Sequence, residues 1–215
     1  YDSRYPENFD EKRLKGENEF YIPLLIQKDA VDKFTNLMEK NKYKLDVYIE
    51  KSINETNPFL LKQKNISLIE YTAFYGSFKI FKYLLNHYVT VKPSIWIYAI
   101  HGNNIKIIHL LEKSDIKPEN YENCLIESIK CHNMGFIDYF NKKYVKTEIN
   151  IKEYAMKYYN FLYIPENISD VELLFYSCKY DYYVIVNFLI QTKNININKK
   201  CNVFFIFIIL IILHQ

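Results

Sequence analysis

Apolar positions along most of this chain follow a helical period that is broken at regular intervals by a small residue and a turn residue. Five segments share one order: a small residue, a turn residue four positions later, and two apolar residues at the fourth and fifth positions after the turn. The small residues, which lie 27, 29, 27 and 22 residues apart, are Thr72, Ala99, Ser128, Ala155 and Ser177. A repeat of this length predicts an all-α solenoid of stacked helix-turn-helix units with short loops. A helical bundle with accidental periodicity is the alternative.

The turn residues are expected to end the first helix of each unit in the left-handed backbone region, which glycine adopts without strain and asparagine tolerates well. They are Gly76, Asn103, His132, Tyr159 and Asp181. The small residues are expected where the first helices of neighbouring units approach closely. The apolar pairs are expected to fill the core that the units share, and they are Ile80-Phe81, Ile107-Ile108, Phe136-Ile137, Tyr163-Ile164 and Ile185-Val186.

The same pattern divides the chain into segments. Residues 1–20 are polar and lack an apolar period, which predicts a flexible lead-in. The other predicted segments are a divergent helical pair and connector over 21–66, repeat units near 67–93, 94–120, 121–149, 150–170 and 171–200, and an apolar tail over 201–215. Asp29 is placed to cap the second helix of the divergent pair, and Pro58 breaks any long helix after it. The fourth unit is degenerate because Pro165 shortens its second helix.

Composition limits the classes of function. Of the 215 residues, 49% are hydrophobic and 25% are charged, as in an ordinary folded protein. The net charge of +3 comes from 28 basic and 25 acidic residues, which is too even to predict a nucleic-acid partner. The cysteines form no CxxC pair, so we expect reduced structural thiols and a cytoplasmic location; they are Cys124, Cys131, Cys178 and Cys201. Because the chain starts at Tyr1 and its first methionine is Met38, we expect a fragment of a longer protein or a product whose start has been removed.

The C-terminal tail contains an unbroken apolar run from Val203 to Leu213. A helix that spans a bilayer needs about 20 such residues, so membrane attachment is the least favoured interpretation of the run. A truncated or misread end is the first interpretation, and a terminal strand or helix that packs on the last unit is the second.

Several segments resemble the ankyrin-repeat family, whose units of about 33 residues carry a T-P-L-H-x-A signature. Residues 67–73 lie on that signature, with Gly76 on the family's glycine and Leu84-Leu85 on its leucine pair. The fifth copy also matches, through Leu174, Ser177, Cys178, Asp181, Ile185, Val186, Leu189 and Ile190. The chain is most similar to a divergent ankyrin-type domain of unknown function that is expanded in parasitic protists. The Pro and His of the signature are absent and the period is short, so we expect tight loops, with a long finger only after the last copy.

The resemblance implies a non-enzymatic scaffold that binds a partner protein through a concave surface, and it brings no catalytic residues or cofactor. The residues next to the small positions on the first helices are expected to form that surface. This predicted stripe consists of Tyr71, Phe74, Tyr75, Tyr98, His101, Glu127, Lys130, Tyr154, Tyr176, Lys179 and Tyr180. Tyrosine is a favoured anchor in protein interfaces because it combines a large contact area with few rotamers. The alternative is that the tyrosines pack against those of the next unit.

No segment carries a pattern typical of catalysis or metal binding. A glycine-rich phosphate loop, an HExxH motif and paired metal-ligand cysteines are all missing from the sequence. Cys131 and His132 are adjacent, so they cannot face one ion from a regular helix. We therefore predict no metal, no cofactor and no small-molecule substrate, and an unidentified protein as the partner. The other candidates are a membrane-associated protein attached through the apolar tail and a regulatory fragment of a larger enzyme.

Overall fold

The computed structural model describes residues 8–145, 149–164, 166–193 and 195. Within these ranges the regular secondary structure is helical, and strand-like pairing is limited to an isolated antiparallel bridge between Tyr48 and Ser67. The prediction of an all-α fold is confirmed for this part of the chain.

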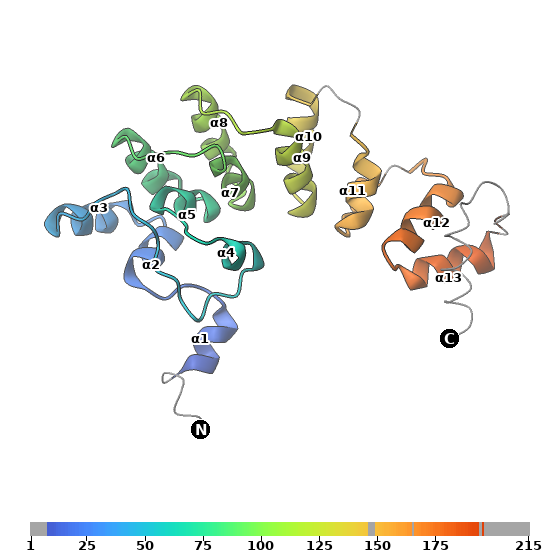
Figure 1. Cartoon of the computed structure of the whole chain (residues 1–215), viewed down its shortest axis with the longest axis horizontal. Coiled ribbons are helices and arrows are strands. Elements are labelled where there is room, and N and C mark those ends of the chain that lie inside the picture. The colour runs from blue at the N-terminus through green and yellow to red at the C-terminus, as the bar shows by residue number, and fades with distance from the viewer. Residues whose placement is uncertain (1–7, 146–148, 165, 194, 196–215) are drawn as a thin grey trace. The chain divides into compact units, whose positions relative to one another are not determined.

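The chain divides into two compact units, Tyr1–Cys124 and Leu125–Gln215, and the division falls inside a helix, α9 (Figure 1). The first unit holds α1 (Phe9–Lys15), α2 (Tyr21–Gln27), α3 (Val31–Lys40), α4 (Pro58–Lys62), α5 (Leu68–Phe74), α6 (Phe78–Asn86), α7 (Ile95–His101) and α8 (Ile105–Lys113). After α9 (Tyr121–Lys130), the second unit holds α10 (Met134–Lys143), α11 (Ile151–Lys157), the 3₁₀ turn η1 (Phe161–Tyr163), α12 (Asp170–Lys179) and α13 (Tyr183–Thr192). The sequence pattern did not indicate this division, which cuts the third predicted repeat unit.

Local sequence signals explain where several first helices begin. In α5 the Ser67 hydroxyl accepts from the Glu70 N–H, and the Glu70 carboxylate accepts from the Ser67 N–H at 2.9 Å. This reciprocal capping box satisfies two donors that an isolated helix start leaves unpaired. Asn150 caps α11 and Ser169 caps α12 in the same position, each accepting from the N–H three residues later.

All five predicted turn residues have a positive φ, from 48° at Asn103 to 65° at Gly76. The helices α5, α9, α11 and α12 end there in a Schellman arrangement, in which two N–H groups fold back onto the last carbonyls of the helix. After α5, the Gly76 N–H donates to Ala73 O at 3.1 Å and the Ser77 N–H donates to Thr72 O at 2.9 Å. The bond to the carbonyl of the small residue recurs from Asn133 to Ser128, from Asn160 to Ala155 and from Tyr182 to Ser177. The prediction of left-handed turns is confirmed.

The prediction that Asp29 caps the second helix of the first pair is wrong. Asp29 is itself the turn residue between α2 and α3, with a φ of 46°, and the N-cap of α3 is Ala30. Its carboxylate instead accepts from the Lys79 and Ile80 N–H groups, each at 3.0 Å, and so caps α6 of the following hairpin. A helix in one hairpin is therefore begun by a side chain of its neighbour.

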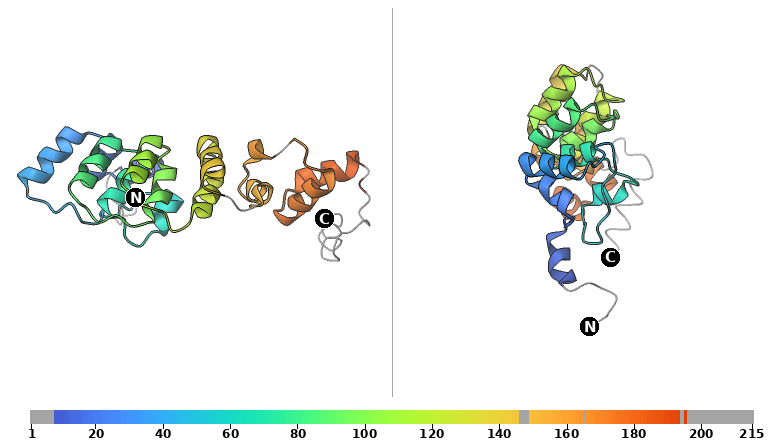
Figure 2. Two further views of the ribbon diagram at one scale, coloured as in Figure 1. Left: turned by 90° about the horizontal axis from the view of Figure 1, so that it is seen from above. Right: turned by 90° about the vertical axis from the view of Figure 1, so that its left-hand side faces the viewer.

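The small residues are fully buried, each with 0% exposure, which agrees with close packing of the first helices. The helices α5 and α7 lie side by side (Figures 1 and 2), and their backbones approach closely at the glycines that follow them, Gly76 and Gly102. A Cβ on Gly76 would lie 2.5 Å from Gly102 O, and a Cβ on Gly102 would collide with Ala73 O. Gly102 is therefore required by contact between two backbones rather than by its φ of −70°.

Neighbouring hairpins are also joined by a recurring hydrogen bond, which we call the tether. The donor is the side chain of the residue that immediately follows a turn residue. The acceptor is a backbone carbonyl of the preceding hairpin, three residues before the turn residue of that hairpin. The tethers run from Ser77 Oγ to Ile26 O, from Asn160 Nδ2 to Ile129 O and from Tyr182 OH to Met156 O. Ser77 and Asn160 are buried, at 2% and 1% exposure, so each tether bonds a polar group that water cannot reach.

The apolar pairs fill the core in the first three copies but not in the fourth. Ile80 and Phe81 have 0% exposure, as do Ile107 and Ile108. Trp96 is fully buried in the first unit, with its Nε1–H bonded to Ile116 O at 2.9 Å. In the third copy Phe136 and Ile137 are buried as well, and in the fifth Val186 joins a core of Leu174, Cys178 and Leu189.

In the fourth copy, Tyr163 and Ile164 are only half-buried, because the second helix is reduced to the single turn η1. The expectation that this pair fills the core is therefore wrong, while the expected shortening of the helix is observed. Pro165, to which the shortening was attributed, lies outside the described residues.

Two further predictions concern the ends of the chain. Residues 9–15 form α1 where a flexible lead-in was predicted, and Asn18 is buried at 3% exposure. Its side chain donates to Glu50 O at 2.7 Å, so a long-range contact orders a segment that has no apolar period of its own. The apolar run from 203 to 213 and the expected long finger after the last copy lie outside the described residues, as do residues 1–7.

Candidate functional site

The predicted stripe residues of the first unit lie together on α5 and α7, but they are not open to solvent. Tyr71 and Tyr98 are buried, with 1% and 4% exposure. Phe74, Tyr75 and His101 are half-buried beside them. We call the surface formed by Phe74, Tyr98 and His101 the aromatic face.

The aromatic face is covered by residues 50–62, a segment that we call the strap and that ends in α4. The ring of Phe59 lies 4.0 Å from the His101 ring in a stacked arrangement. It also stacks on Phe74 at 5.8 Å, with 3° between the ring planes, and meets Tyr98 edge-on at 5.0 Å. These centroid distances are those of favourable aromatic contacts, so one side chain of the strap engages two neighbouring hairpins.

A helix start signal shapes the tip of the strap. The Asn57 side chain accepts from the N–H groups of Phe59 and Leu60 at 2.9 and 3.3 Å, and Pro58 occupies the first helical position. Asn at the N-cap followed by Pro is a strong signal for a helix start. The resulting helix has five residues and is too short to be stable alone, so its shape depends on the cap and on docking.

The N-terminal segment holds the strap in place. Arg13 Nη1 donates to Glu55 O at 3.0 Å and to Ile53 O at the same end of the strap. The Thr56 N–H donates to Gly16 O at 3.0 Å, and Ser52 Oγ donates to the Glu19 carboxylate. The strap is thus fixed by polar bonds to α1 and the residues after it, while the ring of Phe59 lies on α5 and α7.

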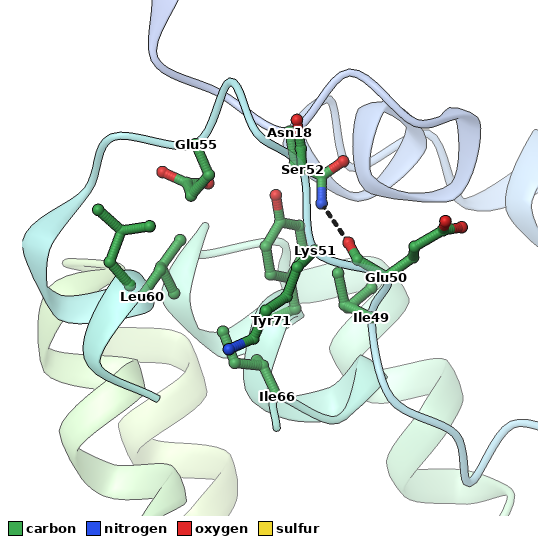
Figure 3. Close-up of a pocket in the computed structure, with 10 residues that line it drawn as sticks. Asn18, Ile49, Glu50, Lys51, Ser52, Glu55, Leu60, Ile66 and Tyr71 are labelled. Atoms are coloured by element: carbon green, nitrogen blue, oxygen red, sulfur yellow. Dashed lines mark hydrogen bonds between the residues drawn. The ribbon is translucent and has the colours of Figure 1, made fainter. Parts of the chain in front are cut away.

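A cavity of about 70 Å³ lies beneath the strap (Figure 3). Its lining includes Tyr71 from α5, Leu60 from α4 and Glu55 from the strap. Glu55 is buried at 7% exposure, and its Oε1 accepts from the Asn57 N–H at 2.8 Å, whereas its Oε2 has no hydrogen-bond partner. Burial raises the pKa of the Glu55 carboxyl, because an ionised group loses solvation there.

Tyr71, which lines this cavity, and Tyr98 on α7 are also removed from water. Burial raises the pKa values of Tyr71 and Tyr98 well above their ordinary value, so both are neutral hydroxyls at physiological pH. The Tyr71 hydroxyl accepts from Gln27 Nε2 at 3.3 Å. These groups can orient a bound polar atom, but their protonation states do not suit general base catalysis near neutral pH.

In the second unit, the predicted stripe residues are joined by polar contacts between α11 and α12. Tyr176 is buried at 5% exposure, and its hydroxyl accepts from Asn150 Nδ2 at 2.7 Å. The Glu153 carboxylate pairs with Lys179 at 2.5 Å and accepts from the Tyr180 hydroxyl at 3.1 Å. The Lys179 ammonium lowers the pKa of the Glu153 carboxyl, which therefore stays ionised.

The remaining stripe residues of this unit are closer to solvent. Tyr154 is half-buried and stacks on Tyr158 at 6.5 Å. Glu127 and Lys130 form an ion pair at 2.9 Å along one face of α9. Lys130 is the more exposed member of this pair, and an ion pair with an exposed member contributes little to stability.

The expected exposure of the stripe is therefore wrong for Tyr71, Tyr98 and Tyr176, which pack inside their units. The reason is that the position before a small residue faces a neighbouring helix or the strap rather than open solvent. Sequence reasoning also missed the strap itself and its Phe59. The Asn57-Pro58 pair could have predicted a helix start, but nothing local indicates where that helix docks.

The chemistry of Cys131 and His132 agrees with structural roles. Burial raises the pKa of the Cys131 thiol to about 12, so the thiol stays protonated and weakly nucleophilic at neutral pH. The His132 Nε2 lies 2.8 Å from Tyr158 O, which can only accept a hydrogen bond, so this ring nitrogen is the donor. The His132 side chain is thus engaged at the turn between α9 and α10.

Comparisons with protein-family models, with curated proteins and with solved structures each returned no match. Within the described residues, no helix has the length and apolar character that crossing a membrane would require. The class that the fold itself defines is a helical protein built from hairpins with left-handed, Schellman-type turns.

Proposed function

We propose that this protein is a non-enzymatic scaffold, an ankyrin-like solenoid of stacked helical hairpins that binds a protein partner through the stripe side of its first helices. The observation that carries the proposal is the recurrence of one turn geometry in five copies, each with a fully buried small residue four positions earlier. Arrays of this kind present repeated side chains along a surface and are typical of protein-binding modules.

The side chains around the cavity beneath the strap favour binding over catalysis. Its lining tyrosine, Tyr71, is neutral, and Glu55 is the carboxylate among its buried lining residues. Ser52 lines the cavity, and we assign the bond from its hydroxyl to the Glu19 carboxylate to the attachment of the strap to the N-terminal segment rather than to activation of a nucleophile. The proposal includes a cytoplasmic location, which the buried thiols of Cys124 and Cys178 support.

The test uses the second unit, where Lys179 is exposed and Tyr154 is half-buried. The full chain is immobilised, and the proteins it captures from a lysate are quantified by mass spectrometry for wild type and for Tyr154→Ala combined with Lys179→Ala. The matched control is Tyr183→Ala combined with Lys193→Ala, which removes a tyrosine and a paired lysine from α13 and the residue after it.

We expect at least one captured protein to fall by about tenfold in the stripe variant, which corresponds to about 1.4 kcal/mol, and to stay constant in the control. Far-UV circular dichroism checks that both variants remain helical. If every captured protein responds equally to the two variants, the stripe does not select a partner and the proposal fails.

A further inference from the structure

We propose that the aromatic face of α5 and α7 is a recognition site for a phenylalanine carried on the first turn of a short, Asn-capped helix, and that the strap occupies this site in cis. The inference rests on the proposed function and deepens it, because it names the chemistry of the partner: a peptide segment of the Asn-Pro-Phe-Leu type.

Phe59 is held in the way that a bound anchor residue is held. Its ring contacts Phe74, Tyr98 and His101, which come from two adjacent hairpins, and it remains half-buried, whereas the next residue, Leu60, is buried at 2% exposure. A single aromatic side chain in a groove formed by several elements is the arrangement by which helical peptides are anchored to binding proteins.

Some buried polar atoms of the strap also lack hydrogen-bond partners where it docks. Glu55 Oε2 and Asn54 Oδ1 are buried without a hydrogen-bond partner, and the cavity of about 70 Å³ lies under the same segment. An unpartnered buried polar group destabilises the folded state, so rehydration of these atoms offsets part of the contact free energy that is lost when the strap leaves the aromatic face. Within the described part of the chain, the other such atom is Ser177 Oγ.

In addition, the strap can leave without dismantling the hairpins beneath it. The turn after α5 is closed by its own backbone bonds, and α5 and α7 contact each other directly. The backbone bonds from Ile49 N–H to Ile66 O and from Leu68 N–H to Val47 O pin the chain on either side of the strap. Its other anchors come from Arg13 of α1, a helix with no buried residue, and from Gly16, Asn18 and Glu19 after it, of which Asn18 is buried.

A competing peptide has to displace a segment tethered at high effective concentration, which is in the millimolar range for short flexible connections. The wild-type site is therefore largely closed to a free peptide. Phe59→Ala removes the resident ring and opens the site, while leaving Phe74, Tyr98 and His101 unchanged.

The experiment titrates a fluorescent peptide that spans residues 53–63 with the full chain and follows fluorescence anisotropy. The expected result is that Phe59→Ala binds the peptide at least about tenfold more tightly than wild type. A peptide in which the position of Phe59 carries Ala is expected to bind the same variant at least about tenfold more weakly. Circular dichroism and the fluorescence of Trp96, the chain's one tryptophan, verify that the variant is folded.

Arg13→Ala provides a second route in case Phe59→Ala does not fold. It removes two bonds to the strap from α1 and leaves the aromatic face and Phe59 intact, so a gain of about threefold or more in peptide binding is expected. Equal binding by wild type and the folded variants, or equal binding of the two peptides, overturns the inference. That failure is distinguishable from failure of the proposed function, because the capture experiment uses residues of α11 and α12 and not the aromatic face.

Discussion

The hairpin of α5 and α6 in the first unit and the segment of α11 and η1 in the second share a turn but differ in the helix after that turn. Ile80 and Phe81 are fully buried after the first turn, whereas Tyr163 and Ile164 are half-buried after the second. Both turns nevertheless have a positive φ and the same pair of Schellman bonds. The turn is therefore set by the backbone, and it survives the loss of the helix that it normally introduces.

The tether survives as well. Ser77 bonds to Ile26 O ahead of the complete hairpin, and Asn160 bonds to Ile129 O ahead of the reduced one. The stripe side differs more, because the strap covers it in the first unit and ion pairs connect it in the second. The repeat is thus defined by its turn and its small residue, and the tether accompanies them at Ser77, Asn160 and Tyr182, while the core and the outer face vary.

The largest expected effect comes from the glycine that lets two backbones meet in the first unit. Gly102→Ala places a Cβ against Ala73 O and 2.8 Å from Gly76 N, and neither atom can move without separating α5 from α7. We expect a loss of about 3 kcal/mol in the free energy of unfolding. Urea unfolding followed by the fluorescence of Trp96, which lies in α7, measures it.

The matched substitution in the second unit is Gly135→Ala in α10. A Cβ there meets Asn133 Oδ1 at 3.7 Å, which is an ordinary contact, so the better helix propensity of alanine raises stability by about 0.5 kcal/mol. Similar effects of the two substitutions, in sign and size, would contradict the close approach of α5 and α7.

The second prediction compares the small positions of the two units. Ala99→Leu and Ala155→Leu both add three carbons at a site with 0% exposure. Overpacking is expected to cost about 3 kcal/mol for Ala99, which lies between well-packed helices, and about 1 kcal/mol for Ala155, where η1 replaces a full helix. Urea unfolding monitored by circular dichroism measures both, and a larger cost at Ala155 would reverse our view of which unit is more tightly packed.

The features that the sequence predicted are those decided by a few neighbouring residues. The positive φ at Tyr159 and the burial of Ala155 agree with the spacing alone, even in the copy whose second helix is lost. The position of Phe59 and the need for a glycine at 102 depend on contacts between hairpins, which no local pattern encodes. The stripe was predicted from position on a helix, and the prediction of its exposure failed where the strap or a neighbour covers it, as at Tyr98.

The third prediction tests whether the tether contributes equally to the free energy of unfolding in both units. Ser77→Ala and Asn160→Ala each remove a buried donor, while the carbonyls of Ile26 and Ile129 keep a bond from the N–H of the turn residue. We expect a loss of about 1 kcal/mol for each. Gln191→Ala on the exposed part of α13 is the control and is expected to change stability by less than about 0.5 kcal/mol. A negligible effect at either tether would show that it is dispensable there.

A fourth, smaller effect concerns the turn residues that are not glycine. Asp181 is exposed and has a φ of 60°, a conformation that is strained for residues with a Cβ. Asp181→Gly is expected to raise the free energy of unfolding by about 0.5 kcal/mol, whereas Asp181→Ala is expected to lower it. Thermal unfolding of the two variants side by side gives the comparison, and the same sign for both would argue against the left-handed turn.

The smallest expected effect compares the unpartnered buried groups of the two units, Glu55 in the strap and Ser177 in α12. Burial raises the pKa of Glu55, so the folded chain holds that proton more tightly than the unfolded chain does. The stability that Glu55 contributes is present below its unfolded pKa of about 4.3 and is lost as the pH rises through the higher folded value. Glu55→Gln carries no titrating proton. Its free energy of unfolding should therefore exceed that of wild type by less than about 1 kcal/mol at neutral pH and match it as the pH falls toward about 4.

Ser177→Ala removes an unpartnered hydroxyl, so its free energy of unfolding should exceed that of wild type by a few tenths of a kcal/mol at every pH. Urea unfolding between these pH limits separates the two, and a Glu55→Gln gain that does not change with pH would mean that this carboxyl is not desolvated beneath the strap.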